Sequence, residues 1–384
     1  MADLPLTVVS KTALRITVGW TPVVGAAGYV FSRDGKRVSN TWDPSKSQVT
    51  FSIPDSQPHT FSVEALQTLS RGELTVNEPA PPPIPPSGGA WWAGPQPPDT
   101  TPPPVPAGAT KITSPADLKT VCSSGGRGGQ YVAAGFTYTG NLDIGNHAGL
   151  ELWLDESVKL VGPAGSALPA VGVHGRGVKV YGGDVSNPDG GSGSGGDGVK
   201  AYVGSGDSAG PDFLWHGLRI HDCAAQGYSS QGSRFAIHGD VSAEISRCGL
   251  NPSLDPHAIK GTGLHACYLG GGDTPTTGRY ILVVHDQPTG AACQTGAHAQ
   301  CELWLAARNL TWTKDRYAGN AFQPWGAGNA IVVKSLLVDG AQVAIFTESL
   351  NGGSATVEFC RYRNIRLAAV QANSHLTVGD LAAA

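Results

Sequence analysis

Hydrophobic and polar residues alternate with a period of two over residues 6–77. The segment "LRITVGW" places Leu14, Ile16, Val18 and Trp20 on one face, and "QVTFSI" and "HTFSVEAL" repeat this alternation. In "GYVFSRDGKRVS" the Asp-Gly step indicates a hairpin turn between two strands, because these residues tolerate positive φ. About seven short strands in this length predict an antiparallel β-sandwich.

These strands resemble a fibronectin type III domain. Trp20 would end strand B, Tyr29 would lie in strand C, and "SIPDSQPHTFSVEA" would lead into strand F. The corner tyrosine of that family is replaced by His59, whose imidazole can supply one hydrogen bond in its place. The resemblance implies a fibronectin type III-like β-sandwich over residues 1–78, of the kind that serves as a spacer or adhesion module.

Residues 79–108 form a proline-rich linker, with thirteen prolines between 79 and 106. Such a run favours an extended polyproline conformation with few internal hydrogen bonds, which predicts a stiff spacer. It also matches ligands of aromatic-lined grooves. Trp91 and Trp92 are candidate binding residues, either for docking on a protein surface or for contact with a sugar ring.

Residues 109–384 consist of short apolar segments separated by Gly, Asn and Asp. One helix is expected at 114–122, with Ser114 as its cap, Pro115 in its first turn, and Leu118 and Val121 on its apolar side. His-Gly pairs at 174, 216 and 238, with Lys-Gly at 260, are spaced by multiples of about 21–22 residues, which favours a solenoid. The expected fold is a right-handed parallel β-helix with a short capping helix, so the chain is all-β; a large sandwich is the alternative.

This half resembles the pectate-lyase-like β-helix superfamily from residue 111 to about 380, whose enzymes cut or epimerise polysaccharides. Asp255-Pro256-His257 is similar to a stretch of β-helix alginate epimerases, which implies that Asp255 and His257 would handle the proton at the sugar C5. Ala258 stands where that family has a second carboxylate. A turn stabilised by the Asp255 side chain is the alternative.

Other acidic residues give no familiar catalytic set. The pairs His221-Asp222 and His285-Asp286 end apolar segments, and strict strand alternation would turn the two members of each pair to opposite sides. Asp184, Asp189 and Asp197 lie in or beside a glycine-rich stretch and could supply oxygen ligands to Ca²⁺, but a glycine loop is the preferred interpretation. We therefore predict no metal and no cofactor.

Composition narrows the function. A net charge of -4 and a pI near 6.2 provide no basic surface for nucleic acid. No apolar run reaches membrane-spanning length. The N-terminus lacks a secretory signal, which suggests a protein made in the cytoplasm and carried out, if at all, in a virus particle.

Seven cysteines without zinc spacing indicate buried free thiols, with a Cys293–Cys301 bridge as the exception.

The combination resembles minor tail proteins, or tail fibres and tailspikes, of phages that infect actinobacteria. It implies a non-catalytic structural or adhesion component of the virion, expected as a homotrimer, that contacts other phage tail proteins and a host surface glycan. Two alternatives stay open: a polysaccharide lyase, hydrolase or epimerase of tailspike type, and a bacterial surface adhesin.

Overall fold

The computed structural model divides the chain into two compact units, residues 1–91 and 92–384, and each is described by itself. The described residues are 4–12, 15–23, 28–34, 36–41, 45–52, 58–66, 71–76, 94–123, 128–145, 149–190, 196–249, 265–287, 290–310, 319–347, 350, 352–371 and 375–383.

The first unit is a sandwich of two antiparallel sheets. Its strands are β1 (Thr7–Thr12), β2 (Arg15–Gly19), β3 (Gly28–Arg33), β4 (Lys36–Thr41), β5 (Gln48–Ser52), β6 (His59–Leu66) and β7 (Arg71–Val76). One sheet has the order β1-β2-β5 and the other β4-β3-β6-β7. Side chains from both sheets share one core, which includes Ile16, Trp20, Phe31, Phe51 and Phe61. The expected alternation is therefore confirmed, while the fibronectin type III assignment stays a prediction.

The turn between β3 and β4 has the predicted hairpin geometry. Arg33 pairs with Lys36, and Asp34 has a φ of 52°. The Asp34 carboxylate also reaches strand β6, where it lies 2.7 Å from His59 Nδ1 and accepts a hydrogen bond from Thr60 N at 2.9 Å. His59 thus anchors the hairpin turn from the buried side of the sandwich.

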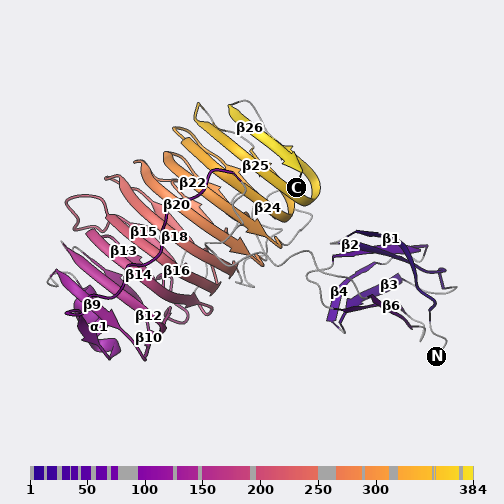
Figure 1. Ribbon diagram of the computed structural model, residues 1–384, viewed down its shortest axis with the longest axis horizontal. Helices are drawn as coiled ribbons and strands as arrows, with labels where there is room; N and C mark the ends of the chain where they lie inside the picture. Colours follow the sequence, from indigo (N-terminus) through magenta and orange to yellow (C-terminus); the bar gives the residue numbers. More distant parts are fainter. Residues whose placement is uncertain are drawn as a thin grey trace. The chain divides into compact units, whose positions relative to one another are not determined.

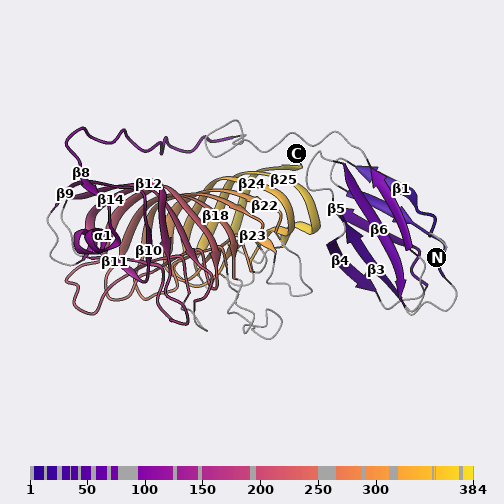
Figure 2. The same ribbon diagram turned by 90° about the horizontal axis from the view of Figure 1, so that it is seen from below.

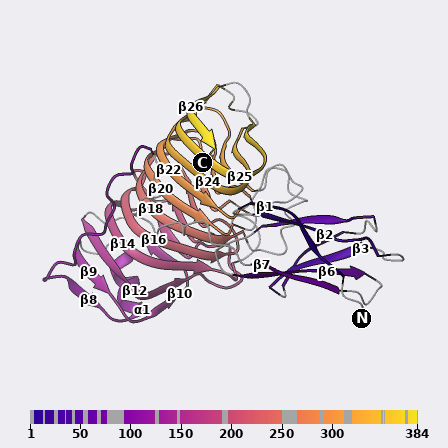
Figure 3. The same cartoon turned by 45° about the vertical axis from the view of Figure 1, so that its right-hand side comes forward.

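The second unit is a right-handed parallel β-helix, whose coils are stacked in sequence order (Figures 1 and 3). Within the described residues, one sheet connects nineteen strands. They are β8 (Thr110–Ile112), β9 (Gly129–Ala133), β10 (Thr137–Thr139), β11 (Leu142–Ile144), β12 (Leu150–Val161), β13 (Val171–Val173), β14 (Arg176–Asn187), β15 (Val199–Tyr202), β16 (Asp212–Cys223), β17 (Tyr228–Gln231), β18 (Ile237–Cys248), β19 (Cys267–Leu269), β20 (Thr276–His285), β21 (Cys293–Thr295), β22 (Ala299–Arg308), β23 (Asn320–Pro324), β24 (Ala330–Phe346), β25 (Ser354–Gln371) and β26 (Leu376–Ala383).

Long strands stack on long strands and short strands on short ones. The long series runs β12, β14, β16, β18, β20, β22, β24 and β25, and the short series begins with β11, β13, β15, β17, β19 and β21. Alternate residues of the long strands enter one continuous core, as Leu150, Leu152 and Leu154 do in β12. Period-two patterning is thus sufficient to place these side chains inward.

The number of residues per coil differs from one coil to another. Val357 pairs with Val378, 21 residues later, whereas Val241 pairs with Tyr280, 39 residues later. The His-Gly pairs also occupy different places in their coils: His216 lies inside β16, while His174 follows β13. The solenoid prediction is confirmed, but its 21–22-residue period is wrong, because the connections between strands vary in length.

Helix α1 (Pro115–Cys122) lies at the first coil. Ser114 Oγ accepts a hydrogen bond from Asp117 N at 3.2 Å, and proline occupies the first turn, as predicted. Leu118 and Cys122 are the buried residues, four positions apart on one side, whereas Val121 is only half-buried. Among the described residues, no helix is long and apolar enough to cross a membrane.

All seven cysteines are free and buried. This agrees with the predicted free thiols and gives no bridge between Cys293 and Cys301. Burial raises the pKa of the Cys122 thiol to about 12, so this group is protonated. All seven side chains are buried and pack as small apolar groups.

Candidate functional site

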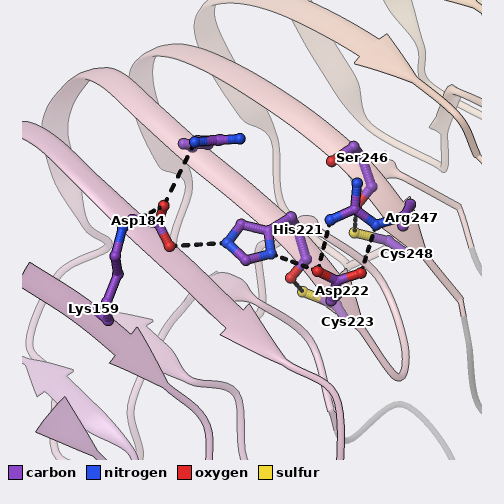
Figure 4. Close-up of polar contacts among 9 residues, drawn as sticks. Lys159, Asp184, His221, Asp222, Cys223, Ser246, Arg247 and Cys248 are labelled. Atoms are coloured by element: carbon purple, nitrogen blue, oxygen red, sulfur yellow. Dashed lines mark hydrogen bonds and ion pairs between the residues drawn. The ribbon is translucent and has the colours of Figure 1, made fainter. Parts of the chain in front are cut away.

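Charged side chains of alternating sign form a column on the outer surface of β12, β14, β16 and β18. Lys159, Asp184, Arg219 and Glu244 are successive partners in the strand register, one from each coil. Lys159 Nζ lies 3.0 Å from Asp184 Oδ2 (Figure 4). Arg219 Nη1 lies 3.9 Å from the same oxygen. Because parallel coils lie about 4.8 Å apart, in-register opposite charges meet without any special loop.

A corner residue beside this column has left-handed backbone in four successive coils. Asp222, Arg247, Asp286 and Asn309 have φ values of 51°, 48°, 53° and 51°. They directly follow His221, Ser246, His285 and Arg308, which are register partners. Left-handed backbone interrupts strand alternation, so each corner side chain can turn back toward its neighbour.

His221 joins the column to the corner. Its Nε2 lies 2.8 Å from Asp184 Oδ1, and its Nδ1 lies 2.7 Å from Asp222 Oδ2 (Figure 4). Asp222 also accepts two hydrogen bonds from Arg247, at 2.6 and 2.7 Å. The expectation that His221 and Asp222 point to opposite sides is therefore wrong, and positive φ at Asp222 is the reason.

The same contact recurs at His285, where His285 Nδ1 lies 3.0 Å from Asp286 Oδ2 and Nε2 lies 2.9 Å from Glu244 Oε1. Hydrogen bonds to Asp286 and Glu244 raise the pKa of His285 to about 9. The separation of the pair His285-Asp286 expected from alternation is thus also wrong, again because the second residue has positive φ. We call the residues Lys159, Asp184, Arg219, His221, Asp222, Glu244, Arg247, His285 and Asp286 the polar ladder.

Electrostatics keep the ladder carboxylates ionised. The Arg247 guanidinium holds the pKa of Asp222 at about 2. Burial works against ionisation of Asp184, but hydrogen bonds from His221 and Lys159 outweigh it and lower the pKa of that carboxyl. The hydrogen bond from His285 lowers the pKa of Glu244. These three groups are hydrogen-bond acceptors at neutral pH, not proton donors.

A second cluster lies at the ends of the short strands. His174 Nε2 lies 3.0 Å from Asp143 Oδ1, and its Nδ1 lies 3.2 Å from Asp207 Oδ1. Tyr202 donates a hydrogen bond to Asp143 at 3.2 Å, and its pKa is raised to about 12, by burial and by Asp143. The hydrogen bond to Asp143 raises the pKa of His174, and these polar contacts also connect neighbouring coils.

The glycine-rich stretch does not gather its acidic residues. Asp184 belongs to the polar ladder, and Asp189 is exposed in a turn. Asp197 is 2% exposed, accepts hydrogen bonds from Ser229 Oγ at 2.7 Å and Gln226 N at 3.1 Å, and has a pKa raised to about 6 by burial. Within the described residues, no group of three or more His, Cys, Asp or Glu is placed to hold a metal ion.

The residues singled out from sequence for catalysis and binding cannot be placed. Asp255, His257, Trp91 and Trp92 all lie outside the described residues. The sequence pointed to Asp184 and to the pairs His221-Asp222 and His285-Asp286, but not to their meeting in the polar ladder. A usable signal was present: a polar Asp, Arg or Asn recurs just after "RIH", "EIS", "VVH" and "AAR", at the end of an apolar strand.

Comparison with known proteins gives distant structural neighbours. No family model and no curated protein matches the chain. An alginate lyase from Paenibacillus sp. str. FPU-7 superposes with a TM-score of 0.44 at 13% identity, covering 70% of this chain and 99% of its own. A Family 28 exopolygalacturonase from Yersinia enterocolitica gives 0.18 at 9% identity over 99% of both chains. The catalytic domain of a GH87 alpha-1,3-glucanase gives 0.25 at 10% identity, covering 95% and 87%.

Proposed function

We propose that this protein is a structural and adhesive component of a phage tail, in which the β-helix is a rigid shaft. The observation that carries the proposal is the coil-to-coil pairing of charges in the polar ladder. Lys159, Asp184, Arg219 and Glu244 neutralise one another across four coils. Side chains engaged in this way hold neighbouring coils in register, which suits a load-bearing rod.

The protonation states support the same reading. Glycoside hydrolysis needs a carboxylic acid with a raised pKa near a second carboxylate. The ladder carboxyls Asp184, Asp222 and Glu244 have lowered pKa values and accept hydrogen bonds from neighbouring cations. In this state they stabilise the rod and do not protonate a leaving group.

The proposal includes the surroundings that the sequence resemblance implies. The protein would be made in the host cytoplasm and assembled into the virion as a homotrimer, in contact with other tail proteins. Its outer surface would meet a host surface glycan, and Trp91 and Trp92 would be docking residues. A fibronectin type III-like first unit would serve as the adhesion module.

Immunogold electron microscopy with antibodies against the full chain tests this assignment. Gold particles on the tails of purified virions would support it. Virions without label, from cultures in which immunoblotting detects the protein, would overturn it. Mass spectrometry of the same purified virions provides an independent measurement of whether the chain is a particle component.

A polysaccharide-degrading tailspike is the second candidate, favoured by the position of the Asp-Pro-His stretch. Asp255 and His257 lie in the sequence eight and ten residues after Arg247 of the polar ladder. Incubation with host capsule or cell-wall polymers would then release new reducing ends or unsaturated sugars. Loss of that product in both Asp255→Ala and His257→Ala, but not in the exposed turn variant Asp189→Ala, would establish catalysis.

A further inference from the structure

A column of large side chains on the β-helix is buried although it lies outside the core. Trp153, Tyr181 and His216 are register partners in β12, β14 and β16, and Ile281 and Trp304 are partners in β20 and β22. Their neighbours in the strands, such as Leu152, Leu154, Leu303 and Leu305, belong to the core. The five outer side chains do not, yet each is only 6–8% exposed. We call them the outer column.

The segment that covers this column is the described end of the proline-rich region, residues 94–104, here named the strap. Trp153 Nε1 donates a hydrogen bond to Pro103 O at 2.9 Å, and Trp304 Nε1 donates one to Pro95 O at 3.2 Å. Figure 2 shows residues 94–108 as a dark purple trace that follows the coils toward β8. This part of the linker is therefore held against the β-helix, a contact that the prediction of a stiff spacer did not include.

Two glycines allow close approach of the strap to the coils. A Cβ added to Gly94 would lie 2.5 Å from Phe359 Cδ1, and one added to Gly217 would lie 3.1 Å from Pro102 Cγ. Gly94 also has a φ of 122°, which disfavours other residues. The chain thus meets the β-helix beside β25 and runs back along the coils to β8 and α1.

The spacing of the two indole contacts matches the geometry of both partners. Trp153 and Trp304 are five coil steps apart, through β14, β16, β18 and β20 to β22. Five steps of about 4.8 Å span roughly 24 Å. Pro95 and Pro103 are eight residues apart, and a polyproline II chain rising about 3.1 Å per residue spans roughly 25 Å.

We infer that the outer column is a polyproline-binding groove and that the strap is its built-in ligand, with a length matched to five coil steps. A polyproline II chain has no internal hydrogen bonds, so its carbonyls are free to accept from indole N–H groups. Prolines restrict the unbound strap, which reduces the entropy lost on docking. The strap ties β12 to β22 across coils that otherwise contact only their neighbours.

The first test changes the length of the strap in the full chain. One proline inserted between Pro97 and Pro98 keeps the polyproline conformation but shifts Pro95 by one residue relative to Pro103. With 5-fluorotryptophan labelling, the resonance of Trp153 or Trp304 should move, while that of the exposed Trp325 should not. The matched control is a proline inserted between Pro85 and Pro86, outside the strap. If both indole resonances stay unchanged in the strap variant, the length match has no role.

The second test removes the indole donors and keeps aromatic rings. Trp153→Phe and Trp304→Phe should each lower the melting temperature of the β-helix by about 2–4 °C. Because one anchor positions the strap for the other, the double variant should lose less than the sum of the two single losses. Additive losses would mean two independent hydrogen bonds, and the inference of a single matched ligand would fail.

Discussion

At the scale of single residues, the polar ladder shows how one backbone conformation brings opposite charges together. Asp222 has left-handed backbone, and this turns its carboxylate toward His221 and Arg247. Aspartate and asparagine tolerate that conformation better than most residues. The charge at this position and its backbone preference can therefore be separated by substitution.

Asp222→Asn keeps the backbone preference but removes the charge that Arg247 and His221 contact. Both Asp222 and Arg247 are partly exposed, so solvent screening reduces the loss to about 1 kcal/mol of unfolding free energy. The pKa of Asp222 is about 2 in the folded protein against 3.8 ordinarily. The stabilisation is thus present above pH 3.8 and is lost as pH falls toward 2.

Denaturant unfolding at pH 7 and at pH 3 measures this difference, which should shrink at the lower pH. Asp222→Ala is the matched control, because alanine adds the strain of left-handed backbone, about 1–2 kcal/mol, to the lost charge. Equal stability of the wild type and Asp222→Asn at pH 7 would contradict the ion pair.

Asp197 is expected to have the opposite effect of pH on stability: its contribution is lost as pH rises, whereas that of Asp222 is lost as pH falls. Burial raises its pKa from 3.8 to about 6, so the folded protein holds this proton more tightly than the unfolded chain. The contribution to stability is fully present below pH 3.8 and is lost as pH rises through 6. In Asp197→Asn the neutral amide can still accept from Gln226 N and contact Ser229 Oγ.

When pH is raised from 4 to 8, the unfolding free energy of Asp197→Asn should therefore increase by about 1–3 kcal/mol relative to that of the wild type. Chemical denaturation at the two pH values gives this number, and Asp189→Asn in an exposed turn is the control that should show no such change. If the unfolding free energy of Asp197→Asn instead fell relative to that of the wild type over this pH range, the raised pKa of Asp197 would be contradicted.

At the scale of elements, the left-handed corner at the ends of β16, β18, β20 and β22 is a repeated unit. The pH dependence of the stability of this corner depends on His285, whose pKa is raised from 6.5 to about 9 by Asp286 and Glu244. The stabilisation is complete below pH 6.5 and is lost as pH rises through 9. Because the partners of His285 are partly exposed and screened by solvent, their contribution to the unfolding free energy is on the order of 1–2 kcal/mol.

Melting temperatures between pH 6 and 9.5 test the corner. The wild type should lose stability over this range, and His285→Gln should show a flatter profile. His238→Gln is the control, since His238 contacts the neutral Thr277 hydroxyl. Parallel profiles for the wild type and His285→Gln would exclude the proposed charge on His285.

The strands and α1 could be predicted because they depend on local patterns. Period-two alternation placed Ile16, Val18 and Phe61 in the first core, and Ser114 with Pro115 marked the start of α1. The corner could not be predicted from alternation, since a single left-handed residue reverses the direction of the side chain. The contact between the strap and the coils could not be predicted for another reason. Trp304 lies 209 residues from its partner Pro95, and no local pattern relates them.

At the scale of the whole molecule, the two units have separate cores. One cluster combines Ile16, Trp20, Phe51 and Phe61 of the first unit, and the other extends along the β-helix from Ile112 to Cys360. Because each cluster takes its residues from one unit, each should melt as its own cooperative transition.

Differential scanning calorimetry should accordingly resolve two transitions in the full chain. Phe61→Leu costs about 1 kcal/mol and should lower only the transition of the first unit, by about 4–8 °C, because that unit is small. Leu305→Ala, which removes a fully buried side chain of β22, costs about 2–5 kcal/mol and should lower only the β-helix transition. A single transition displaced by both substitutions would mean that the two cores unfold as one, and the β-helix could then not act as an autonomous shaft.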